Sequence, residues 1–91
     1  MAVEIRLPTL LRVHADGAAS VSAVGETVGQ VFHALTAAYP GLSDQLIDGD
    51  GALHRFVNVY VNDDDIRYLG ALDTPVSERD IVSILPAVAG G

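Results

Sequence analysis

The residues that are most able to take part in a reaction lie at the end of the chain, whose last eight residues are ILPAVAGG (84–91). Gly90 and Gly91 have no Cβ, so this segment can enter a channel too narrow for side chains. The carboxylate of Gly91 is a poor electrophile and needs activation, typically as an acyl-adenylate that a partner enzyme makes with ATP. Proximity inside that partner would then accelerate attack on the carbonyl. The alternative is that a glycine pair at a chain end is merely a frayed terminus.

Four small, uncharged residues precede the terminal carboxylate, and this strengthens the chemical interpretation. They are Ala87, Val88, Ala89 and Gly90. We predict that 87–91 is a flexible tail that enters the active site of a partner, with Gly91 as the reacting residue. The six residues from Pro86 to Gly91 span at most about 20 Å when extended.

Composition limits the classes of protein that this chain can represent. Its 91 residues suffice for one domain, and 49% of them are hydrophobic. Lys and Arg number only 5 and the formal net charge is −7, which argues against a nucleic-acid binder and fits a basic protein partner or simple solubility. The absence of cysteine removes disulfides and thiolate sites. Without a membrane-length apolar run or a signal peptide pattern, we expect a cytoplasmic protein that does not bind membranes.

The polar residues do not form a recognisable catalytic or metal-binding motif. His14, His33 and His54 lack metal-site spacing. The acidic run 63–65 fits a turn better than a calcium loop, because the later bidentate glutamate is missing. No Ser-His-Asp order, phosphate-binding loop or carboxylate pair is present. We therefore expect a protein that is not an enzyme and binds no metal or cofactor itself.

Alternating apolar residues predict a hairpin at the start of the chain. Val3, Ile5 and Leu7 alternate with polar neighbours in a first strand that Pro8 ends. A turn by composition at 14–17 leads to an alternating segment, 19–24, that can return beside the first strand.

A helix is predicted next. Thr27 and Gln30 form a T-x-x-Q capping box, and Pro40-Gly41 ends the segment. The apolar residues at helical spacing, which should pack on a sheet, are Val28, Val31, Phe32, Leu35 and Tyr39. Residues 42–55 hold a short amphipathic piece followed by a flexible turn at 48–51.

The second half of the chain predicts three further strands. The segment 56–61 (FVNVYV) is the strongest, with its valines toward the core. A turn at 62–65 leads to a short strand at 66–69, and an irregular connection covers 70–79. The last strand, 80–86, is nearly all apolar, which predicts a central strand covered on one face and shielded on the other.

This order of elements predicts an α+β roll in which one main helix crosses a mixed sheet. The first and last strands should pair in parallel at its centre. Residues 1–86 then form the domain, and 87–91 the flexible tail.

One face of the 56–61 strand is a candidate docking patch for a partner. Phe56, Asn58 and Tyr60 share this face, and Arg67 would frame it. Equally, a loop or the last strand could cover these residues and make them ordinary packing residues. His54 and Arg55 either touch the rim of a partner's active site or form a loop end that feeds the strand.

The whole chain resembles the ubiquitin-like sulfur carriers of the MoaD/ThiS family. The resemblance rests on GETVG (25–29), FVNVYVN (56–62) and the final Gly90-Gly91. LHRFVN (53–58), NDDDIR (62–67) and ILPAVAGG (84–91) resemble most closely the members that serve an actinobacterial route of cysteine biosynthesis. The resemblance implies a β-grasp fold.

The resemblance also implies a reaction cycle. An E1-like adenylyltransferase would adenylate Gly91, and a sulfur donor would convert it to a thiocarboxylate. A pyridoxal-phosphate (PLP) cysteine synthase would use this sulfur, and a zinc-dependent peptidase would release the cysteine. ATP, PLP and zinc would all belong to these partners.

Three other interpretations stay open. The sulfur could instead serve the molybdopterin or thiazole pathway, with the chain as the small subunit of molybdopterin synthase or as a thiazole sulfur carrier. The chain could be a ubiquitin-like modifier that is joined to target proteins, or an interaction domain with an inert tail.

Overall fold

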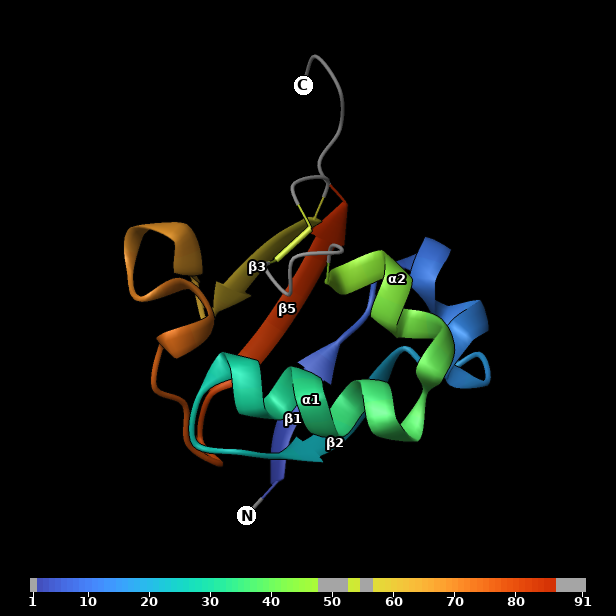
Figure 1. Ribbon diagram of the computed structural model, residues 1–91, viewed down its shortest axis with the longest axis horizontal. Helices are drawn as coiled ribbons and strands as arrows, with labels where there is room; N and C mark the ends of the chain where they lie inside the picture. Colours follow the sequence, from blue (N-terminus) through green and yellow to red (C-terminus); the bar gives the residue numbers. More distant parts are fainter. Residues whose placement is uncertain (1, 48–52, 55–56, 87–91) are drawn as a thin grey trace.

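The computed structural model describes residues 2–47, 53–54 and 57–86 of the chain, with Pro86 described through its backbone. One five-stranded mixed sheet in the order β2-β1-β5-β3-β4 is crossed on one face by a helix, α1 (Figure 1). The fold is the predicted β-grasp. The predicted turn at 48–51, the residues Arg55 and Phe56, and the tail at 87–91 lie outside the described residues, so the division into domain and tail stays a prediction.

The elements have the following bounds. The strands are β1 (Ala2–Arg6), β2 (Ser20–Val24), β3 (Val57–Val61), β4 (Asp64–Asp65) and β5 (Ile81–Pro86). The α-helices are α1 (Val28–Ala38) and α2 (Ser43–Leu46). The 3₁₀ helices are η1 (Thr9–Ala15), η2 (Pro40–Leu42), η3 (Ile66–Tyr68) and η4 (Ala71–Asp73).

The first two strands form the predicted antiparallel pair. Val3 lies opposite Ala23 and Ile5 opposite Val21, and all four side chains are buried. The connection is more structured than expected, because η1 fills most of it. The predicted turn is found only at its end, where Asp16 and Gly17 adopt positive φ angles of 57° and 83°.

Helix α1 begins at the predicted N-cap and packs its predicted face on the sheet. The Thr27 Oγ1 accepts a hydrogen bond from the Gln30 N–H at 3.2 Å. The Gln30 Oε1 accepts from the N–H of Glu26 at 2.9 Å, one residue before the N-cap, so the capping box is shifted from its predicted form. The residues at helical spacing are buried except Tyr39, which is half-buried against the core.

The last strand is central, as predicted. β5 runs parallel to β1, with Ile5 beside Val82, and antiparallel to β3, with Val59 beside Ile84. The expectation that both of its faces are covered is wrong. Ile84 is 1% exposed beneath the helix, whereas Leu85 is 47% exposed on the other face. The helix layer covers only one side of the sheet (Figure 1).

The predicted short strand at 66–69 is also wrong, because residues 66–68 form η3. The Asp65 Oδ1 accepts a hydrogen bond from the Arg67 N–H at 2.9 Å, and the Leu69 N–H donates to the Ile66 carbonyl at 3.0 Å. These local bonds curl the backbone, so only Asp64 and Asp65 pair with β3. The predicted turn is therefore confined to Asn62 and Asp63.

Candidate functional site

The candidate site lies where β5 ends, because the reactive segment predicted from the sequence begins after Pro86. β1 pairs with β5 only as far as Arg6 beside Ser83, whereas β3 continues to pair as far as Val57 beside Pro86. The last three residues of β5 therefore extend past β1. Pro8, the N-cap of η1, turns the chain away at this point.

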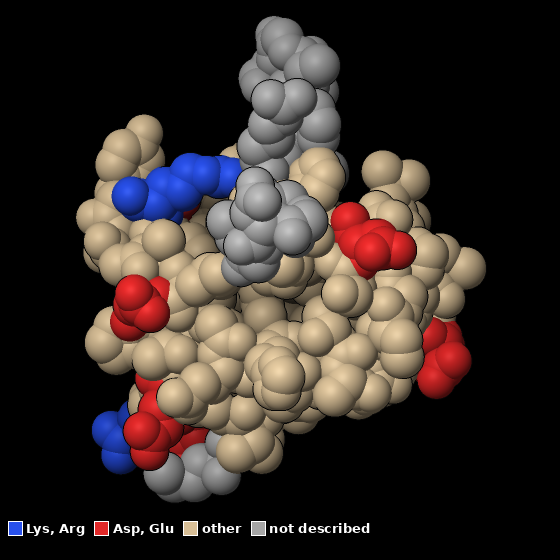
Figure 2. Space-filling view, in the orientation of Figure 1, with Lys and Arg blue, Asp and Glu red and all other residues tan. Residues whose placement is uncertain are grey.

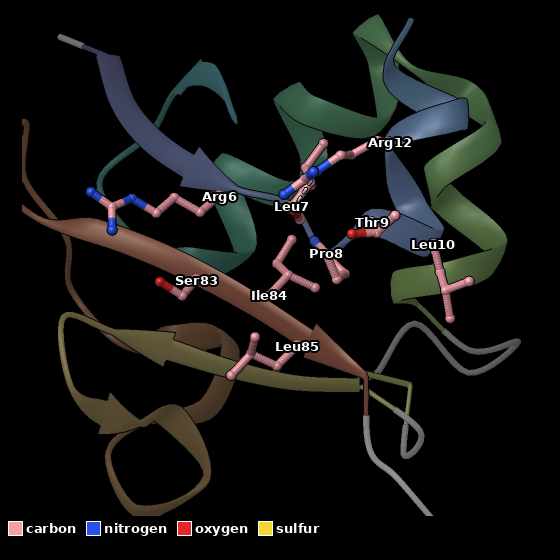
Figure 3. Close-up of a pocket in the computed structure, with 9 residues that line it drawn as sticks. All are labelled: Arg6, Leu7, Pro8, Thr9, Leu10, Arg12, Ser83, Ile84 and Leu85. Atoms are coloured by element: carbon pink, nitrogen blue, oxygen red, sulfur yellow. Dashed lines mark hydrogen bonds between the residues drawn. The ribbon is translucent and has the colours of Figure 1, made fainter. Parts of the chain in front are cut away.

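The departure of β1 leaves an open groove beside the end of β5 (Figure 3). One wall comes from Pro8, Leu10 and Arg12, at the start of η1 and within it, and the other from Ile84 and Leu85. Leu10 is 74% exposed and Leu85 47% exposed. The groove is mainly apolar, and the guanidinium of Arg12 is held at its edge by a 3.2 Å hydrogen bond from Nε to the Leu7 carbonyl.

Arg67 occupies the other side of the strand end. Its Nη1 donates to the Asn58 Oδ1 at 2.8 Å, and its Nη2 donates to the Val57 carbonyl at 2.7 Å. Nη2 also lies 3.5 Å from the His54 carbonyl. Because Val57 is the register partner of Pro86, this guanidinium is hydrogen-bonded to the residue that lies one strand spacing, roughly 5 Å, from the end of β5.

The structure brings together most of the described residues predicted for partner docking. Asn58 lies beside Leu85, and Tyr60 lies beside Ser83 on the sheet face opposite α1. Asn58, Tyr60 and His54 are half-buried. β5 lies beside β3 within the sheet and does not cover it, so one of the two packing explanations is excluded. The docking role of these residues stays a prediction.

Leu10, Arg12 and Leu85 were not among the site residues predicted from the sequence. The apolar character of 80–86 predicts that both faces of the strand are covered, although Ser83 between buried Val82 and Ile84 indicates that the odd-numbered positions of β5 face outward. Nothing in the pattern of η1 distinguished exposed Leu10 from buried Leu11, because a 3₁₀ segment lacks the apolar spacing of an α-helix.

Figure 2 shows one face of the molecule, on which acidic side chains lie at several places around a broad area of the described residues that carries no charged side chain. Among the described residues, no group of three or more His, Cys, Asp or Glu side chains is placed to hold a metal ion. No helix within these residues is long and apolar enough to cross a membrane.

The opposite end of β5 is fastened by a polar cluster. The Asn62 Nδ2 donates to the Asp80 Oδ1 at 3.0 Å, and the Asn62 Oδ1 accepts from the Ile81 N–H at 3.1 Å. The Ser77 N–H donates to the Asp80 Oδ2 at 2.9 Å. The hydrogen bonds from Asn62 and Ser77 hold the pKa of Asp80 below its usual value, because they favour the ionised carboxylate.

Comparison with known proteins places the chain in a family. The model of the ThiS family matches residues 5–91. The chain therefore belongs to the ThiS family, whose β-grasp fold it shares. This class comprises ubiquitin-like sulfur carriers rather than catalysts.

Individual relatives are similar along the whole chain. The sulfur carrier protein CysO of Mycobacterium tuberculosis is 53% identical over 93 residues that cover 100% of both chains. The crystal structure of the Amycolatopsis orientalis BexX/CysO complex contains a chain with a TM-score of 0.90 and 44% identity, covering 99% of this chain and 100% of that one. The small archaeal modifier protein 3 of Haloferax volcanii is 42% identical over 65 residues, 71% of this chain and 70% of the relative.

Proposed function

We propose that this protein is a sulfur carrier whose Gly91 carboxylate is adenylated and then converted to a thiocarboxylate that donates sulfur, most directly for cysteine biosynthesis. The observation that carries the proposal is the 53% identity, over the full length of both chains, with a sulfur carrier protein. The geometry supports it because the central strand ends beside an open groove, immediately before the segment that contains Gly91.

The chemistry requires little of the carrier beyond access. A carboxylate oxygen of Gly91 attacks the α-phosphorus of ATP, and pyrophosphate leaves. A sulfur nucleophile then attacks the acyl carbon, so that a C–S bond forms and the C–O bond to AMP breaks. The partner enzymes supply the ATP site and the proton transfers, and the carrier contributes a terminus that they can position.

The adenylating enzyme must contact the end of β5. The five residues after Pro86 span at most about 18 Å, so the active site that receives Gly91 lies within that distance of the strand end. The surface around this point, which we call the exit surface, consists of Pro8, Leu10, Arg12, Leu85 and Arg67. Its apolar centre and two flanking guanidiniums fit an apolar contact on the enzyme bordered by acidic groups.

The proposed destination of the sulfur is a PLP-dependent cysteine synthase in the cytoplasm, followed by a zinc-dependent peptidase that releases the cysteine. The similarity to CysO supports this destination over the molybdopterin and thiazole pathways. In each case the sulfur leaves from the same terminal carbon, and the second enzyme determines the product.

A second candidate function is protein modification, which the similarity to a small archaeal modifier protein supports. Here the activated Gly91 would be joined to amines of target proteins. This alternative predicts conjugates of higher mass on a denaturing gel.

The test is the intact mass of the protein after incubation with an E1-like adenylating enzyme, ATP and sulfide. We expect a mass increase equal to exchange of one oxygen for sulfur, located at Gly91. Deletion of Gly91 is the control and should abolish the increase. If a folded carrier and an enzyme that activates another carrier give no increase, this pairing is wrong, and conjugates in place of the thiocarboxylate would favour the modifier.

A further inference from the structure

The basic residues of this chain share a chemical property that the proposed function does not require. All five are arginines, at positions 6, 12, 55, 67 and 79, and the sequence contains no lysine. A guanidinium keeps its proton at any physiological pH and is a poor nucleophile, whereas a lysine amine can attack an activated carbonyl. The chain also contains no cysteine, so it offers no thiol.

The fold also separates the start of β1 from the end of β5. β1 and β5 are parallel, with Glu4 beside Ile81, so the start of β1 and the end of β5 lie at opposite ends of the sheet. Ala2 lies two residues before Glu4, and Pro86 lies five residues after Ile81. Along the strand direction the two residues are therefore separated by about 23 Å, at about 3.3 Å per residue. The five residues after Pro86 reach only about 18 Å.

Two arginines lie at positions where a lysine amine could readily attack the activated Gly91 carbonyl. The guanidinium of Arg67 lies near Pro86, through its 2.7 Å bond to the Val57 carbonyl, and Arg12 lines the groove beside Leu85. Both positions are well within the reach of the tail. An amine at either position would meet an activated Gly91 at the high effective concentration of an intramolecular reaction.

We infer that this protein is an acyl donor only: its arginines supply positive charge around the activated terminus without an amine that could capture it. This inference extends the proposed function and rests on it, because the difference between arginine and lysine matters here only if Gly91 is activated. The reaction avoided is attack by an amine nitrogen on the Gly91 carbonyl. In that reaction a C–N bond forms, the bond to AMP or sulfur breaks, and the amine loses a proton.

The test activates Gly91 chemically and does not depend on any partner enzyme. The chain is released from a C-terminal intein fusion with mercaptoethanesulfonate, which leaves a thioester at Gly91. Its mass and its migration on a denaturing gel are followed at pH 8. For the native chain we expect hydrolysis to the acid as the sole product. An internal amide or ester, or a dimer, would overturn the inference.

Matched arginine-to-lysine substitutions provide the comparison. Arg67→Lys should form an internal amide, one water lighter than the acid, at a rate independent of protein concentration and about tenfold faster than hydrolysis. Arg12→Lys is a second position within reach, in case Arg67→Lys fails to fold. Arg79→Lys, before the far end of β5, should form little internal product. If Arg67→Lys and Arg12→Lys are folded and hydrolyse like the native chain, the inference is wrong. Failure of the proposed function would be detected separately, as failure of the sulfide reaction described above.

Discussion

The two faces of β5 have opposite properties although their residues alternate along one strand. Val82 and Ile84 are buried under the helix layer at 0% and 1% exposure, whereas Leu85 is 47% exposed beside the groove. The two ends of β5 differ as well. The hydrogen bond between Asn62 and Asp80 holds the start of the strand, whereas β1 does not pair with its last three residues. The strand is therefore anchored on one face and at one end, and accessible on the other face and at the other end.

The largest expected effect tests the two faces directly. Ile84→Ala removes a fully buried side chain and should lower the free energy of unfolding by about 2–5 kcal/mol. Leu85→Ala, at the next position, should change it by no more than about 0.5 kcal/mol. Urea denaturation followed by circular dichroism measures both. Equal losses at the two positions would show that the open face is covered in solution.

An intermediate effect is expected when the exit surface is made acidic. Leu10→Glu and Leu85→Glu should each weaken binding to the adenylating enzyme about tenfold or more, because they place a charge in the apolar centre of the contact. Isothermal titration calorimetry measures the affinity. Val24→Glu is the matched control, since Val24 is 61% exposed but lies opposite Ala2, at the other end of the sheet. Equal weakening by Val24→Glu would place the interface elsewhere.

The smallest effect concerns the fastened end of β5. The pKa of Asp80 is lower in the folded protein than its ordinary value of 3.8, so the ionised carboxylate stabilises the fold above that value. This contribution is lost as the pH falls through the folded-state pKa. Asp80→Asn should therefore reduce the melting temperature slightly at pH 7, with a smaller reduction at pH 3. A difference between the two proteins that grows on acidification would contradict this assignment.

The regular elements could be predicted from the sequence because their patterns coincide with burial. The alternation of Val3 and Ile5 matches a strand with one buried face, and the spacing of Val28, Phe32 and Leu35 matches the face of α1 on the sheet. The nearly continuous apolar character of 80–86 correctly indicated a central strand. It overstated the coverage of that strand, because Leu85 is apolar without being buried.

The errors fall where tertiary or local hydrogen bonds decide the backbone. Residues 66–69 contain an apolar pair suited to a strand, but the side chain of Asp65 binds the Arg67 N–H and starts a 3₁₀ turn. The groove depends on where β1 stops relative to β5, and a register between strands distant in sequence cannot be read from either strand alone. Arg67 was expected near Asn58, and the structure places their side chains 2.8 Å apart.

The double pairing of β5 has a mechanical consequence. Its backbone is hydrogen-bonded to β1 on one edge and to β3 on the other. A pull on the chain end along the strand axis would load both ladders in shear, so that many hydrogen bonds resist together instead of opening one after another. An enzyme that grips the terminus and draws it inward can therefore exert tension on this protein without unravelling the domain that it holds.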